Sequence, residues 1–108
     1  NDNGKYLENS VLLHLNKNKN LDDKITYFQG NYECDFVVQR MEDVVELIQV
    51  CWDISEKETL KREIRGLLEA SKITNCDNLN IITIEEERTI QIEEKMINII
   101  PAWKWMMQ

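Results

Sequence analysis

The sequence predicts a single α/β domain in which a mixed β-sheet is flanked by helices. Patterns typical of helices and strands follow one another in the order α-β-β-β-α-β-β-β-α along 108 residues, a length that fits one domain. The strand-like run at 44–52 is apolar almost throughout, which is typical of a central strand covered on both faces. The amphipathic stretch at 56–72 is long enough to connect two parallel strands.

The N-terminal segment 5–17 is predicted to be a helix. Its leucine and valine side chains recur at the spacing of a helical turn, with polar residues between them. The polar run 16–23 interrupts this pattern and is expected to be a loop.

Three strands are predicted next. Segment 24–29 is rich in β-branched and aromatic residues, and Gly30-Asn31 supplies a turn into a second strand at 33–40. Residues 41–43 turn the chain into the third strand at 44–52. Three antiparallel strands are therefore expected before the helix at 56–72.

The helix at 56–72 is expected to begin with a capping box. Ser55 and Glu58 have the S-x-x-E spacing in which the hydroxyl accepts from an amide one turn later and the carboxylate reaches back. One face of this helix carries Leu60, Ile64, Leu67, Leu68 and Ser71.

The C-terminal part is predicted to hold three further strands and a short helix. A loop at 74–78 leads to an isoleucine-rich strand at 78–86, and segments 89–94 and 95–100 follow a turn. Pro101 is expected at the first position of the last helix. The glutamates at 85–87, 93 and 94 are interpreted as a solvated hairpin that protects a sheet edge.

The charge balance argues against general nucleic-acid binding. Lys and Arg total 13 against 20 Asp and Glu, a net charge of −7, which repels phosphate backbones. No apolar run approaches the roughly 20 residues that span a bilayer, so no membrane association is expected. An odd number of cysteines, without any C-x-x-C pair, suits a reducing cytoplasm and predicts no zinc site.

The order αβββαβ, with an acid near the start of the second strand, resembles the PD-(D/E)XK restriction-endonuclease-like fold. Members of that fold place a carboxylate on the first helix, an Asp on the second strand and acid-x-Lys on the third. Glu8 matches the helix carboxylate and Asp35, in E-C-D-F, matches the strand aspartate. Gln49 and Cys51, in I-Q-V-C, stand where the acid and the lysine are expected. Because Cys is mostly neutral near pH 7, it cannot replace the ammonium.

A second resemblance covers nearly the whole chain, to the C-terminal domain of a prokaryotic family of AAA-type P-loop ATPases. It is carried by L-E-N, E-C-D-F-V-V, E-L-I-Q-V-C-W-D-I-S, E-T-L-K-R-E-I-R-G-L-L-E-A and I-I-P-A-W-K-W. This resemblance implies that residues 1–108 are one nuclease-like domain at the C-terminal end of a longer bacterial protein. It implies that the upstream ATPase domain is the partner in the same chain and binds ATP and Mg²⁺. No G-x-x-x-x-G-K-[ST] motif occurs here, so no cofactor is expected in this domain.

Gln49 and Cys51 can each be interpreted as structural rather than catalytic residues. Gln49 is expected to be a buried amide paired with Asp35, Glu8 or local backbone, because an unpaired buried amide costs about 1–3 kcal/mol. Cys51 is expected in the core, since nothing places the only histidine, His14, beside it.

The leading hypothesis is a non-catalytic interaction or regulatory domain with a vestigial site at Glu8, Asp35, Gln49 and Cys51. The alternative is a metal-dependent DNA nuclease with a rearranged site. In that alternative Glu46 would replace the missing acid, although its odd separation from Gln49 predicts the opposite face of a strand. A stand-alone adaptor is a third reading. For the aromatic end, with Trp103 and Trp105, packing over the sheet and docking to a partner both remain open.

Overall fold

The computed structural model of the chain describes residues 2–108 as a six-stranded mixed sheet between helices. The elements follow the predicted order, and their bounds are α1 Asp2–Asn18, β1 Asp23–Gln29, β2 Glu33–Arg40, β3 Asp43–Val50, α2 Lys57–Thr74, β4 Leu79–Thr83, β5 Arg88–Ile92, β6 Lys95–Pro101 and α3 Ala102–Trp105. The strands lie side by side in the order β1-β2-β3-β4-β6-β5. The predicted α/β class is confirmed.

Strand directions agree with the reading of the second helix as a crossover. The first three strands pair antiparallel, and β3 pairs parallel with β4 after α2. Strand β6 lies parallel to β4, and β5 pairs only with β6 and forms the edge. Strand β4 is shorter than predicted, because the Thr83 hydroxyl donates to the Glu86 carbonyl at 2.8 Å and turns the chain.

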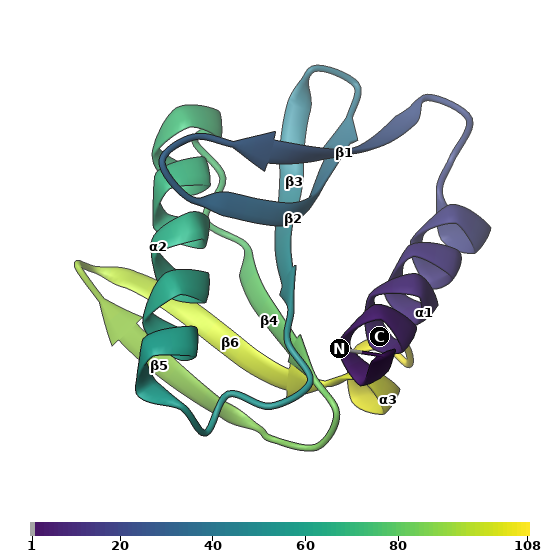
Figure 1. Ribbon diagram of the computed structural model, residues 1–108. Helices are drawn as coiled ribbons and strands as arrows, with labels where there is room; N and C mark the ends of the chain where they lie inside the picture. The colour runs from purple at the N-terminus through teal and green to yellow at the C-terminus, as the bar shows by residue number, and fades with distance from the viewer. Residues whose placement is uncertain (1) are drawn as a thin grey trace.

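Two hydrophobic cores lie on the two faces of the sheet. Helix α2 lies on one side of the sheet, and α1 and α3 lie on the other (Figure 1). On one face α2 packs its Ile64 and Leu67 against the buried isoleucines of β4 and β6. On the other face α1 contributes Leu7 and Val11, and α3 contributes Trp105. The result is a three-layer α/β/α arrangement in which the central strands are covered on both sides.

Strand β2 contains a β-bulge. Its register with β1 shifts so that Asp35 and Phe36 together lie opposite Tyr27. In a regular strand residues two apart share a face. Here Cys34 packs in the core beneath α2, whereas Phe36 packs in the core beneath α1. The bulge therefore redirects the chain at Asp35, the residue that the sequence analysis matched to the strand aspartate of the nuclease-like fold.

The predicted capping box of α2 is wrong. The N-cap residue is Glu56, which makes no side-chain cap hydrogen bond, and α2 begins one residue later. The Ser55 amide instead donates to Asp53 Oδ1 at 2.9 Å. The Ser55 amide therefore bonds to Asp53 rather than to Glu58, because a carboxylate two residues earlier in the chain is a strong local acceptor.

The last helix also begins later than predicted. Pro101 belongs to β6 and α3 starts at Ala102. Trp105 is buried against α1, with its ring 5.0 Å from that of His14, whereas Trp103 is 61% exposed. Packing is thus confirmed for one tryptophan of the pair.

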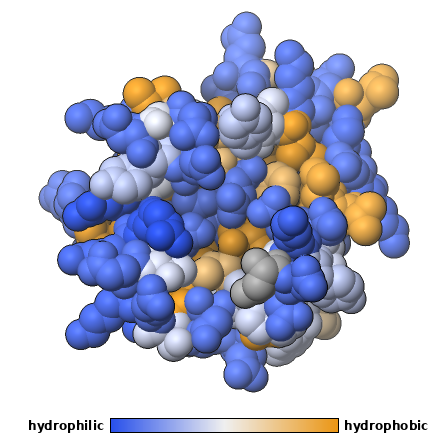
Figure 2. Space-filling view, viewed as in Figure 1, coloured by the Kyte–Doolittle hydropathy of each residue, from blue (hydrophilic) through white to orange (hydrophobic). Residues whose placement is uncertain are grey.

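The surface in the view of Figure 2 is mostly hydrophilic, and its apolar side chains gather on the side where α1 lies. Leu13 and Leu21 are among the exposed apolar residues. Within residues 2–108, none of the helices combines the length and the hydropathy that a membrane crossing needs.

We predict that Ser55→Ala changes the free energy of unfolding by less than about 0.5 kcal/mol, whereas loss of a true N-cap costs about 1 kcal/mol. Asp53→Ala is expected to destabilise the protein measurably, because it removes the acceptor of the Ser55 amide. Urea denaturation of both variants measures the difference. A larger loss for Ser55→Ala than for Asp53→Ala would contradict this description of the helix start.

Candidate functional site

The candidate site is a hollow where α1, α2 and the ends of β2 and β3 meet. Five charged residues line it, together with uncharged neighbours: Glu8 from α1, Glu33 and Asp35 from β2, and Arg62 and Glu63 from α2. Four of these five carry carboxylates, so the hollow is strongly acidic. The sequence predicted two of its members, Glu8 and Asp35.

Asp35 and Gln49 form two reciprocal bonds between neighbouring strands. The regular pairing of β2 with β3 ends at Phe36 and Ile48. Beyond it, the Asp35 amide donates to Gln49 Oε1 at 2.9 Å, and the Val50 amide donates to Asp35 Oδ2 at 2.8 Å. Side chains therefore satisfy two backbone groups that the ladder no longer pairs.

The amide nitrogen of Gln49 is used as fully as its oxygen. It donates to the Glu33 carbonyl at 2.7 Å and to the Glu63 carbonyl at 3.0 Å, and the residue is 1% exposed. One buried side chain thus joins β3 to β2 and to α2. Of the partners predicted for Gln49, which were Asp35, Glu8 or local backbone, Asp35 is confirmed through its amide. The other partners are the Glu33 and Glu63 carbonyls, and within residues 2–108 no hydrogen bond joins Gln49 to Glu8.

Gly66 permits this close approach of α2. A Cβ at this position would lie 1.9 Å from the Glu33 carbonyl oxygen and 2.4 Å from Gln49 Nε2. Both distances are far shorter than any van der Waals contact. The helix can therefore reach the Gln49 amide only with glycine at this turn.

Burial changes the ionisation of two carboxyl groups in the hollow. It raises the pKa of Asp35 to about 6, with a contribution from the Glu8 and Glu33 charges, although the Val50 amide acts in the opposite direction. Burial also raises the pKa of Glu63 to about 7, and the Asp35 charge adds to the increase. Each of these acids is harder to ionise because it is desolvated and has acidic neighbours.

Cys51 lies beside this hollow rather than in it. It lines an adjoining hollow with Glu8 and Val50, and its Sγ donates to the Asp53 carbonyl at 3.3 Å. Burial raises the pKa of this thiol, so it stays protonated near neutral pH. It also packs against the core beneath α2, as predicted. Of the four predicted residues, the structure brings Glu8 and Asp35 to one hollow, with Gln49 bonded beneath them.

Glu46 lies on the opposite face of the sheet from this hollow. Its Oε2 accepts from Asn80 Nδ2 at 2.7 Å and from Trp105 Nε1 at 3.0 Å. Strand β3 is regular from Glu46 to Gln49, so their odd separation puts them on opposite faces, and the extra residue Val45 in the pairing with β2 lies outside this stretch. Replacement of the missing acid by Glu46 is therefore wrong, as its odd separation from Gln49 predicts.

Glu33 and Glu63 are the two carboxylates of the hollow that the sequence analysis did not predict, and Glu63 is the one that left a signal. It borders the apolar face of α2, next to Ile64 and one turn before Leu67, and this position was the signal that it faces the sheet. Within residues 2–108, however, no group of three or more His, Cys, Asp or Glu side chains is arranged to hold a metal ion.

We predict that Gln49→Glu destabilises the protein by about 3–5 kcal/mol at neutral pH, because it places an anion against two carbonyl oxygens and leaves them without a donor. The control Gln91→Glu, on the exposed part of the edge strand β5, should stay within about 0.5 kcal/mol of the wild type. Urea denaturation at pH 7.5 compares them. Equal stability of the two variants would show that the Gln49 contacts do not hold the strands.

The raised pKa values of Asp35 and Glu63 predict lower stability as pH rises. The folded state keeps these protons where the unfolded chain has lost them, so the free energy of unfolding falls between about pH 4.5 and pH 7. Glu63→Gln should remove about 1–2 kcal/mol of that fall. Glu58→Gln, on the exposed side of the same helix, is the control. Denaturation curves at pH 5 and pH 8 test this, and an unchanged fall in Glu63→Gln would contradict it.

One curated relative was found in an archaeon. The uncharacterized protein MJ1544 of Methanocaldococcus jannaschii is 36% identical over 110 aligned residues. The alignment covers 94% of this chain and 24% of that protein, so the chain spans about a quarter of the length of its relative. No protein-family model matches the chain, and no solved structure matches it significantly.

Proposed function

We propose that this chain is a non-catalytic, nuclease-like interaction or regulatory domain of a longer AAA-type ATP-binding protein. The observation that supports this proposal best is the set of hydrogen bonds that the Gln49 side chain makes. The residue that stands at the position of the catalytic acid directs its amide nitrogen at two carbonyl oxygens and its oxygen at the Asp35 amide. A metal-binding carboxylate in the same place would repel those carbonyls.

The position of the catalytic lysine supports the same proposal. Cys51 is a neutral thiol that donates to the Asp53 carbonyl, and it has no positive charge to stabilise a phosphate. Arg62 is the one cation among the described residues that line the hollow, which four carboxylates also line. An acidic hollow of this kind attracts phosphate esters poorly.

The placement within a longer protein rests on two supports. The relative is about four times as long as the matched region, which is expected for a domain of a larger chain. The assignment of an ATPase domain to the rest of such a chain comes from the resemblance of the sequence motifs. ATP and Mg²⁺ would bind there, and the two domains of one chain would be each other's partners.

A metal-dependent nuclease with a rearranged site is the second candidate. The observation that favours it is the position of Glu63, which lines the same hollow as Glu8 and Asp35. These carboxylates from α1, β2 and α2 would have to move closer together to supply the oxygen ligands that Mg²⁺ and Mn²⁺ prefer, because within residues 2–108 no three of them are arranged to hold a metal ion. Against it, the high pKa of Asp35 and of Glu63 disfavours the ionised forms that such ligands require.

A plasmid-nicking assay with Mg²⁺ or Mn²⁺ separates the two candidates. We predict that the wild type and Asp35→Asn give the same background, because no catalytic site depends on that carboxylate. The Asn side chain keeps an oxygen that can accept from the Val50 amide. This variant therefore removes the negative charge of Asp35 and keeps the hydrogen bond that supports the fold. Glu63→Gln should behave in the same way.

Nicking by the wild type that disappears in both Asp35→Asn and Glu63→Gln would overturn the non-catalytic proposal and establish the nuclease. Thermal melts of the three proteins show whether the variants are folded.

A further inference from the structure

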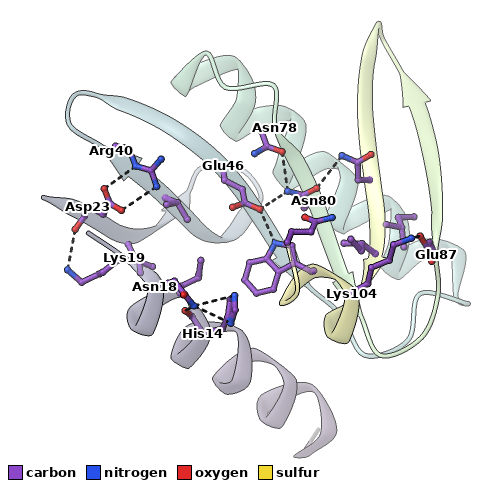
Figure 3. Close-up of a pocket in the computed structure, with 18 of the residues that line it drawn as sticks. His14, Asn18, Lys19, Asp23, Arg40, Glu46, Asn78, Asn80, Glu87 and Lys104 are labelled. Carbon is purple, nitrogen blue, oxygen red and sulfur yellow. Dashed lines mark hydrogen bonds and ion pairs between the residues drawn. The ribbon is translucent and has the colours of Figure 1, made fainter. Parts of the chain in front are cut away.

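A pocket of about 600 Å³ opens between α1, α3 and the sheet, on the opposite face from the candidate site (Figure 3). This volume lies within the range typical of small-molecule sites. None of the residues that line it belongs to the vestigial site at Glu8, Asp35, Gln49 and Cys51. The pocket is therefore a separate candidate for ligand binding, and its charges indicate the kind of ligand that it fits.

Most of the charged residues that line this pocket are neutralised by ion pairs. Lys19 and Glu46 are the two that form no ion pair with a residue in the range 2–108. One cation and one anion of the lining thus remain for a ligand. The ion pairs of the others are Arg40 with Asp23, Lys104 with Glu87, and Arg88 with Glu86.

The anionic end of the pocket is the carboxylate of Glu46. Its Oε2 accepts from Asn80 Nδ2 at 2.7 Å and from Trp105 Nε1 at 3.0 Å, and both donors are neutral. Its Oε1 makes no hydrogen bond with another described residue. Because Glu46 is half-buried, and the polar side-chain atoms that such described residues bury all have partners, Oε1 is accessible to solvent. A carboxylate that is fixed through one oxygen and open at the other fits a ligand ammonium group.

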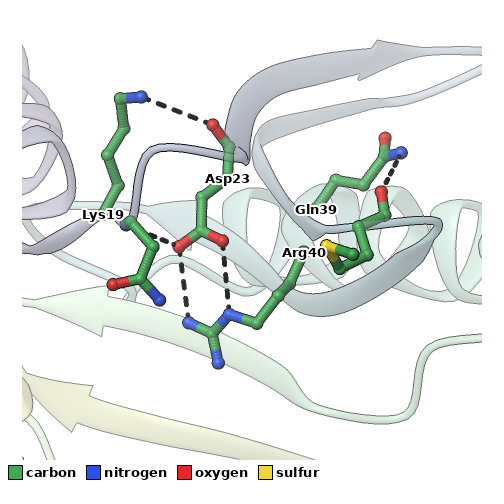
Figure 4. A network of polar contacts seen from close by, with 6 residues as sticks. Lys19, Asp23, Gln39 and Arg40 are labelled. Atoms are coloured by element: carbon green, nitrogen blue, oxygen red, sulfur yellow. Dashed lines mark hydrogen bonds and ion pairs between the residues drawn. The ribbon is translucent and has the colours of Figure 1, made fainter.

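The cationic end lies beside the start of β1. The Asp23 carboxylate accepts from Arg40 Nε at 3.3 Å and from Arg40 Nη2 at 3.5 Å (Figure 4). The Lys19 ammonium donates only to the backbone carbonyl of Asp23, at 3.4 Å. Two cations beside one anion leave one positive charge. The Arg40 side chain is 54% exposed and makes no hydrogen bond through Nη1 within residues 2–108, so this end fits a ligand carboxylate.

The floor beside these two ends is apolar. Val38 is the pairing partner of Glu46 on one side and of Ile25 on the other, so the three side chains lie on one face of the sheet. Arg40 lies two residues from Val38 along β2, which is about 7 Å. Leu15 of α1 packs against the same core and also lines the pocket. A ligand that reaches both ends therefore crosses aliphatic side chains, which favours a methylene chain between its charges.

We propose that this pocket binds a small zwitterion whose ammonium and carboxylate are separated by a short aliphatic chain, as in an ω-amino acid. The ammonium donates to Glu46 Oε1, and the carboxylate accepts from Arg40 and lies beside Lys19. An α-amino acid carries both charges at one carbon, so it reaches one end at a time. This site is independent of the function proposed for the opposite face, and either proposal can fail without the other.

Titrations followed by NMR test the proposal, with 6-aminohexanoate, hexanoate, hexylamine and glycine as probes. 6-Aminohexanoate should give saturable shifts of the Trp105 indole and of the Arg40 Nε–H resonance, which report on the two ends of the pocket. Hexanoate and hexylamine should each bind about tenfold more weakly, because each lacks one of the two charged contacts. Glycine should bind about tenfold more weakly as well, because it cannot span the two ends.

The variant Glu46→Gln removes the charge of the anionic end and keeps an oxygen that can accept from Asn80 and Trp105. It should weaken the binding of 6-aminohexanoate about tenfold and leave that of hexanoate unchanged, since hexanoate has no ammonium. The control Glu33→Gln, in the opposite hollow, should change neither affinity. The spectrum of each variant shows whether it is folded.

Three results would overturn the proposal. The first is an absence of saturable shifts with 6-aminohexanoate. The second is binding of hexanoate, hexylamine or glycine as tight as that of 6-aminohexanoate, which would show that the pocket does not recognise two separated charges. The third is an unchanged affinity of Glu46→Gln for 6-aminohexanoate.

Discussion

Strands β2 and β3 separate at one end, and two side chains keep them joined there. The Gln49 amide replaces the missing backbone partner of Asp35, and the Asp35 carboxylate replaces that of Val50. Because both strands are central to the sheet, unpaired amides at this point would be buried at a cost of about 1–3 kcal/mol each. The same Gln49 side chain ties α2 to the sheet, and Gly66 provides the space for it. The position of α2 and the integrity of the sheet thus depend on one neutral amide.

This arrangement gives the acidic hollow its character. Asp35 is held by the Val50 amide at one oxygen and is surrounded by Glu8, Glu33 and Glu63. Burial and the charges of neighbouring acids raise the pKa of Asp35 to about 6 and that of Glu63 to about 7, so both groups take up a proton more readily than exposed carboxyls do. A protonated carboxyl is a poor metal ligand. These raised pKa values support the proposal that the hollow is a structural junction, and a larger polar pocket lies on the other face.

Periodicity was sufficient to predict much of the fold. The helices, the strand order through the α2 crossover and the burial of Gln49 follow from apolar spacing and the cost of an unpaired amide. The β-bulges could not be predicted in this way, because one extra residue in a strand leaves no mark on composition. The bulge in β2 decides where Asp35 points. The capping box failed because Asp53, two residues before Ser55, is the better local acceptor. Asn80 and Asn98 lie 18 positions apart and become neighbours only through the β4–β6 pairing.

Hydrogen exchange at the backbone amides of Asp35 and Val50 shows whether the Gln49 and Asp35 side chains hold β2 and β3 together. Both amides lie beyond the last regular pair of the β2–β3 ladder, so only the Gln49 and Asp35 side chains protect them. We predict protection close to that of well-bonded amides in the same strands, such as that of Leu47, which donates to the Asn78 carbonyl at 3.0 Å. Rapid exchange at Asp35 and Val50, with the Leu47 amide still protected, would show that these side chains do not hold the strands together.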